Sequence, residues 1–166
     1  MPVYKHTGDW PGQAAGLLFV PARGFAMTVL TNATSGMPLR DELMFADNGP
    51  LRLFTGLRYP PAVPQVLTAA RLAPYEGRYW AQVIAPPPGD AAETWFEFTA
   101  RDGRLATQML AGENALTTQM AFYRDNYVRI LDPSGEPVVL RADFIPGPDG
   151  RIAWFRFGGR LHARRG

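Results

Sequence analysis

The residues of this sequence that are best suited to do chemistry stand together near its start, in the run His6, Thr7 and Gly8. A histidine has an ordinary pKa near neutrality and can relay a proton. A threonine hydroxyl can donate a hydrogen bond to a substrate, and a glycine lets a ligand come close to the backbone without a Cβ clash. Acyl transfer needs groups of this kind around a hydroxyl nucleophile. The three residues alone are a weak signal, so the surrounding sequence must show whether they belong to an acyl-transfer site.

The elements around this run are predicted from apolar periodicity and from turn residues. Ala14–Val20 and Phe25–Leu30 are apolar on nearly every residue, which indicates strands covered on both faces. Pro21-Ala22-Arg23-Gly24 lies between them and predicts a hairpin turn. An amphipathic helix is expected from Met37, and Asn48-Gly49-Pro50 should break it, with a second short helix starting at the proline.

The remainder of the chain has a different distribution of turn residues. Residues 58–72 read as a proline-containing linker, and residues 73–166 read as short strands separated by turns such as Asp102-Gly103 and Asp149-Gly150. Pro86-Pro87-Pro88-Gly89 is expected to be a loop. Regular strand spacing predicts a small antiparallel barrel or sandwich. The expected strands are Thr94–Thr99, Leu105–Leu110, Thr117–Tyr123, Tyr127–Leu131, Val138–Ile145 and Ile152–Phe157.

Residues 5–34 resemble the third-motif region of class C β-lactamases and penicillin-binding-protein-like serine hydrolases. The resemblance is carried, in order, by His6-Thr7-Gly8, Pro11-Gly12, Pro21 with Arg23-Gly24, and Thr31-Asn32-Ala33. It implies that residues 1–57 are the C-terminal part of such a catalytic domain, with antiparallel strands and a closing helix. Together with the barrel, the expected fold class is mainly β (α+β).

The resemblance also implies a role for each residue of the motif. His6 would supply proton relay or positive potential, and Thr7 would bind a substrate carboxylate or carbonyl. Gly8 would allow close backbone approach, and the backbone N–H of Asp9 would be one oxyanion-hole donor, so Asp9 is a catalytic candidate together with His6. Trp10 is a candidate substrate-facing wall, with plain loop packing as the alternative. The Asp9 carboxylate departs from the family, where this residue is small or neutral; replacing it by Asn is expected to change little.

A second resemblance covers the barrel. Leu72–Tyr79, with the closing Asp149–Ile152, is similar to the lipocalin-like C-terminal domains that are appended to many of these hydrolases. Such domains shape substrate access or mediate oligomerisation, so a homo-oligomer is one expectation. Nine aromatic residues are expected mainly to fill the barrel, with a ligand cavity as the alternative: Trp80, Trp95, Phe96, Phe98, Phe122, Tyr123, Trp154, Phe155 and Phe157.

The family's nucleophile, in Ser-x-x-Lys, is missing. Ser35 and Ser134 each have a proline three residues on, Lys5 is the only lysine, and no tyrosine starts a Tyr-x-Asn or Tyr-x-Ser motif. We therefore expect a C-terminal fragment of a serine hydrolase, inactive alone and partnered by the missing N-terminal part of the catalytic domain. The expected substrate is a D-amino-acid peptide, a β-lactam or a small ester. The alternative is a non-catalytic binding or interaction module built on the barrel.

Composition narrows the partners further. The formal net charge is only +2, from 17 basic and 15 acidic residues, which gives no indication of nucleic-acid binding. The chain has no cysteine, and its two histidines lie far apart, so no metal and no other cofactor is expected. His162 is expected at the surface, and Arg160, Arg164 and Arg165 in a solvated terminus. The resemblance implies a periplasmic or secreted parent protein, with the cytoplasm as the alternative.

Overall fold

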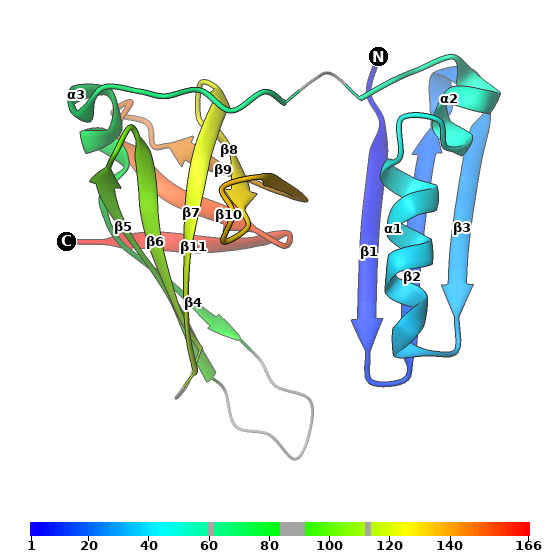
Figure 1. The fold of residues 1–166 in the computed structure, drawn as a ribbon, viewed down its shortest axis with the longest axis horizontal. Coiled ribbons are helices and arrows are strands. Elements are labelled where there is room, and N and C mark those ends of the chain that lie inside the picture. The colour runs from blue at the N-terminus through cyan, green and yellow to red at the C-terminus, as the bar shows by residue number, and fades with distance from the viewer. Residues whose placement is uncertain (60–61, 84–91, 112–113) are drawn as a thin grey trace. The chain divides into compact units, whose positions relative to one another are not determined.

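The computed structural model describes residues 1–59, 62–83, 92–111 and 114–166 (Figure 1). The chain divides into two compact units, Met1–Pro61 and Ala62–Gly166, and each is described by itself. The loop expected at Pro86-Pro87-Pro88-Gly89 lies outside the described residues. The predicted mainly β fold is confirmed, because the first unit holds a three-stranded sheet and the second an eight-stranded antiparallel barrel.

The sheet of the first unit is a meander of three antiparallel strands. Its order is β1 (Tyr4–Trp10), β2 (Gln13–Val20) and β3 (Phe25–Thr31). The predicted hairpin between β2 and β3 is confirmed: Pro21–Arg23 forms a 3-10 turn, and Gly24 closes it with a φ of +58°, which favours glycine.

Two helices follow the sheet, as predicted. Helix α1 spans Met37–Phe45 and α2 spans Pro50–Thr55, with Pro50 in the first turn of α2. Proline is suited to this position because the first helical N–H has no partner within the helix. Helix α1 packs against one face of β2, and the resulting core contains Leu18, Val20, Met44 and Leu51.

The second face of the sheet is open within the part of the unit that the structure describes. The burial of β2 alternates, with Leu18 fully buried and Leu17 39% exposed. Leu30 of β3 is 80% exposed and Tyr4 of β1 is 48% exposed. The expectation that these strands are covered on both faces is therefore wrong for the described chain, because α1 covers one face only.

The second unit is a closed antiparallel barrel. Its strand order is β10-β11-β4-β5-β6-β7-β8-β9, so each of these described strands has two neighbours and none of them is an edge strand. Helix α3 (Ala69–Leu72) lies at one end of the barrel (Figure 1), where Leu67, Leu72 and Tyr75 pack against the core. The strands are β4 (Gly77–Val83), β5 (Ala92–Arg101), β6 (Arg104–Ala111), β7 (Asn114–Arg124), β8 (Tyr127–Leu131), β9 (Pro137–Pro146), β10 (Ile152–Phe157) and β11 (Arg160–Arg165).

Aromatic rings fill the barrel. The ring of Phe155 lies 4.9 Å from the rings of Phe96, Phe98 and Phe144, and Tyr79 is fully buried beside them. The contacts with Phe96 and Phe98 are edge-to-face and the contact with Phe144 is tilted, so the rings form a hydrophobic core in the interior. The expectation of a filled barrel holds for Phe96, Phe98, Phe122 and Phe155, which belong to this core, and for Phe157, which packs against it. It is wrong for the remaining four aromatic residues, which are half-buried and lie outside the core: Trp80, Trp95, Tyr123 and Trp154.

Two expectations about the C-terminal strand need correction. His162 is buried, with 2% of its surface exposed, and its ring stands edge-on to Phe96 at 4.9 Å. Its local sequence is basic, but the inward side of β11 places it in the core. Arg164 is exposed, but it is not only a solvated terminal residue, because its guanidinium donates hydrogen bonds to the carbonyls of Pro74 and Glu76.

No helix among the described residues is long and apolar enough to cross a membrane.

Candidate functional site

Strand β1, which carries the His6-Thr7-Gly8 motif, is an edge strand. It pairs with β2 on one side, and no other described strand pairs with it. The Pro11-Gly12 turn joins Trp10 to Gln13, its register partner, with Gly12 at a φ of +84°. The pair that flanks such a two-residue turn is hydrogen-bonded, and bonded and non-bonded pairs then alternate along the strands. By this alternation, the backbone N–H groups of Thr7 and Asp9 point to the open edge.

The side chains of the motif divide between the two faces of the sheet. Successive strand residues point to opposite faces, so His6, Gly8 and Trp10 share one face while Thr7 and Asp9 share the other. The face of Thr7 and Asp9 is the one that α1 covers, because Asp9 contacts Arg40 of that helix. The structure thus brings the candidate residues onto one strand, but it does not place the His6 and Thr7 side chains on one face.

The uncovered face around Gly8 is accessible. His6 is exposed, Trp10 is 57% exposed, and a Cβ built on Gly8 would meet no atom within 4 Å. A ligand could therefore lie against the backbone of Gly8 with the imidazole and the indole on either side of it. Trp10 is thus an exposed residue at the end of strand β1 and not a packed loop residue.

Arg40 was not singled out from the sequence, yet it is the buried charge closest to the motif. Its side chain is 6% exposed, and one guanidinium nitrogen, Nη1, pairs with Oδ1 of Asp9. Its Nη2 lies 2.7 Å and its Nε 2.9 Å from Oδ1 of Asp41. A signal in the sequence was Gly16 within an apolar run, because its missing side chain leaves the room that Arg40 occupies.

The electrostatics of this contact favour a charged Arg40. Burial by itself lowers the pKa of the Arg40 guanidinium. Hydrogen bonds and charge attraction from Asp41 and Asp9 outweigh that effect, so the pKa ends above its ordinary value. Arg40 therefore carries a positive charge on the α1 side of the sheet. It contacts Asp9, the residue that follows Gly8 in β1.

Comparison with known proteins shows the fold. The chain is similar to the crystal structure of SurE with D-Leu, with a TM-score of 0.52 and 23% sequence identity, over 98% of this chain and 35% of that chain. A further crystal structure of SurE gives a TM-score of 0.51 at 23% identity, over 98% of this chain and 34% of that chain. The chain thus spans about a third of the length of the SurE chains that it matches. No family model and no curated protein matches the sequence.

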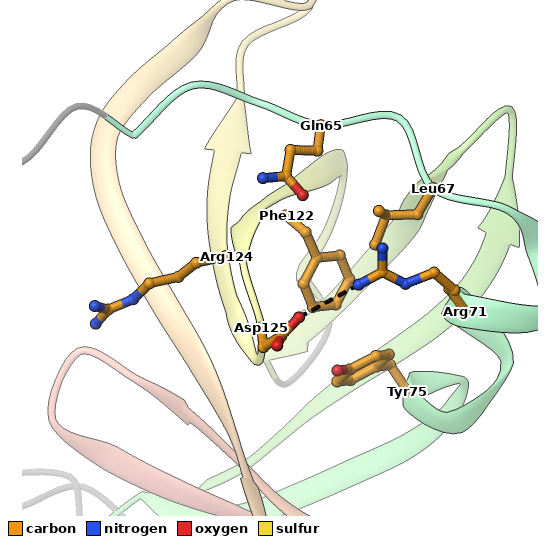
Figure 2. A pocket seen from close by; sticks show the side chains of 7 residues that line it. All are labelled: Gln65, Leu67, Arg71, Tyr75, Phe122, Arg124 and Asp125. Carbon is orange, nitrogen blue, oxygen red and sulfur yellow. Dashed lines mark hydrogen bonds and ion pairs between the residues drawn. The ribbon is translucent and has the colours of Figure 1, made fainter.

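Two hollows lie in the barrel unit, at the end where α3 stands. The smaller one, drawn in Figure 2, is about 30 Å³ and has space for one water molecule. An ion pair of 3.3 Å between Arg71 and Asp125 crosses it, and Arg124 points away from the other side chains (Figure 2). The larger hollow is an open cleft of about 470 Å³. It is lined by Pro74, Tyr75, Asn126, Pro146, Gly150, Arg151, Ile152 and Arg164.

No metal centre is found in the part of the chain that the structure describes. No group of three or more His, Cys, Asp or Glu side chains there is arranged to hold an ion. His6 and His162 belong to different units, and His162 is enclosed by aromatic rings. Strand β1 itself carries an imidazole, a hydroxyl, a carboxylate and backbone N–H groups.

Proposed function

We propose that this chain supplies the third-motif strand and an accessory barrel of a serine hydrolase that works through an acyl-enzyme. In this proposal His6 relays a proton or supplies positive potential near the nucleophile, and Thr7 binds a carboxylate or carbonyl of the substrate. The backbone N–H of Asp9 is one of the oxyanion donors. The barrel is of the lipocalin-like kind and assists substrate access or assembly.

The observation that carries the proposal is the open edge of β1. An oxyanion hole needs fixed N–H donors that no other backbone group has already engaged. The N–H of Asp9 meets this condition by its place in the hairpin, since it points away from β2. The same edge can pair with an extended peptide, as edge strands do in other peptide complexes. The bare backbone at Gly8 adds the space that a bound acyl group needs.

The substrate class that we favour contains a D-amino acid. SurE, whose fold resembles that of this chain, has been crystallised with D-Leu. A peptide with a D-residue would pair through its backbone along β1 and present its side chain toward the face of His6 and Trp10. β-Lactams and small esters remain the other acyl donors that this kind of site would accept.

The serine nucleophile comes, in this proposal, from sequence outside these 166 residues. Neither Ser35 nor Ser134 has a lysine three residues on. The uncovered sheet face with Tyr4, Leu17 and Leu30 is apolar and exposed, and such a surface is suited to pack against further protein. The rest of a catalytic domain would cover it and bring the nucleophile to the edge of β1.

The test is a comparison of two proteins. One is the 166-residue chain. The other, called the joined protein, is the longer protein that is encoded when the reading frame is extended into the sequence that precedes it in its genome. Both are assayed with a D-amino-acid anilide, a chromogenic cephalosporin and a p-nitrophenyl ester. We expect turnover only in the joined protein, and only where the added sequence contains Ser-x-x-Lys. A joined protein that contains this motif, folds and turns over none of the three substrates would refute the proposal.

A further inference from the structure

An acidic residue beside an oxyanion donor is a chemical problem that this fold must solve. The backbone N–H of Asp9 is the proposed donor, but the side chain of the same residue carries a negative charge, and 44% of it is exposed. A carboxylate next to the donor opposes the negative charge that develops in the transition state. The only described ion pair of Asp9 is with Arg40.

The contact is built into the packing between α1 and the sheet. Arg40 is 5% exposed, and its stem passes over Gly16 of β2, where a Cβ would stand 3.0 Å from Cγ and 3.1 Å from Cδ. Asp41, the next residue along α1, holds the other side of the guanidinium through Nε and Nη2. Asp41 thus orients the guanidinium of Arg40 toward Asp9. The absence of a side chain at Gly16 leaves the space that the Arg40 stem needs to cross β2.

We propose that Arg40 is a positioning residue of the acyl-transfer site, which holds the Asp9 carboxylate on the α1 side of β1 and neutralises its charge. The strand edge then presents the Asp9 N–H without an opposing charge beside it. This inference rests on the proposed function of β1. It adds a residue of α1 that the resemblance did not assign, and it gives a reason for the departure from the family at Asp9.

A purely structural ion pair would behave differently from a positioning pair, and a double-mutant cycle separates the two. The cycle uses R40Q, D9N and the double variant in the joined protein, with kcat, KM and the melting temperature measured for each. R40Q leaves the Asp9 charge uncompensated, so we expect kcat to fall about tenfold or more with little change in KM. In the double variant the charge is gone, so kcat should recover most of this loss although the melting temperature stays low.

A second arm reports on the geometry without any activity. In the 166-residue chain, NMR should show a slowly exchanging Nε–Hε signal of Arg40. D9N should shift this signal, and R40K, which has no guanidinium, should remove it and so assign it to Arg40. The outcomes are distinct. If wild-type joined protein is inactive, the proposed function and this role fail together. If it is active but R40Q and R40Q/D9N lose kcat equally, in proportion to lost stability, only the positioning role is overturned.

Discussion

His6 and Leu17 stand opposite each other in the register of β1 and β2, on the sheet face that α1 leaves uncovered. Leu17 is 39% exposed, so the imidazole lies at the border of an apolar surface. The hydroxyl of Thr7, one residue on, belongs to the other face. The roles of the His6 imidazole and the Thr7 hydroxyl should therefore be separable by mutation.

The first prediction concerns His6 and Thr7 in the joined protein. His6→Ala should lower kcat by about 10²–10⁴-fold, the usual range for general acid–base help, because proton relay acts in the transition state. Thr7→Ala should mainly raise KM, because its hydroxyl binds the substrate equally in ground and transition states. Steady-state kinetics from pH 5 to 9 checks both. If His6→Ala keeps wild-type kcat/KM throughout, the motif describes the fold alone.

The second prediction concerns Gly16. A Cβ there would meet Met44 Sδ at 2.1 Å and the stem of Arg40 at 3.0 Å. Because Met44 is 1% exposed and cannot move into solvent, Gly16→Ala should cost about 1–3 kcal/mol of unfolding free energy. Gly8→Ala is the matched control, since the added Cβ meets no atom within 4 Å. Equal losses for both variants in urea denaturation would contradict this account of the α1 packing.

The third prediction concerns pH and His162. Burial lowers the pKa of the His162 imidazole below its usual value, although hydrogen bonding to the Phe155 carbonyl partly opposes this. In the unfolded chain the pKa is about 6.5, so the unfolded state takes up the proton first as pH falls. Stability is then complete above about pH 6.5 and is lost below it, by at most about 1.4 kcal/mol per pH unit.

The measurement is the unfolding free energy between about pH 7.5 and pH 5.5, a range that brackets the ordinary histidine pKa. His162→Gln and His162→Phe should each flatten the slope over this range, whatever they do to stability at pH 7.5. A slope that is the same in wild type and in both variants would show that the buried ring does not titrate between the two states.

The fourth prediction concerns proteolysis. Arg58 is exposed and precedes the boundary between the two units. Residues further on are held to the barrel, since Gln65 N donates to the Phe122 carbonyl at 2.7 Å and Leu67 N to the Gly103 carbonyl at 3.0 Å. Trypsin should therefore cut after Arg58 before it cuts after Arg71, and the fragment from Tyr59 onward should persist. A first cut after Arg71, read by mass spectrometry, would count against this.

Sequence reasoning reached those features whose cause is local. Pro21 and Gly24 predict the hairpin, and Pro50 predicts the start of α2. The turn residues between residues 102 and 159 and the apolar segments between them predict β5 to β10, whereas β4 and β11 were not among the expected strands. Each of these residues restricts or permits backbone angles whatever surrounds it. The candidate motif at His6 was also visible, because it is contiguous.

The missed features depend on contacts between distant residues. Arg40 lies 31 residues from Asp9 in the sequence, and nothing in its local pattern says that it is buried. His162 stands among arginines, but the barrel closes through β11 and turns it inward. The covering of β2 and β3 was overestimated, because apolar residues on both faces do not reveal which face a helix of the same chain will cover.

The most direct test of the central claim is the mass of the intact joined protein after incubation with a penicillin. The account predicts one added penicillin per chain, on the serine of a Ser-x-x-Lys motif that precedes residue 1. It also predicts no adduct on the 166-residue chain alone, since Ser35 and Ser134 lack the lysine. An adduct on the chain alone would contradict the assignment of β1 to an acyl-enzyme site. So would a folded joined protein that contains the motif, forms no adduct and turns over none of the three substrates.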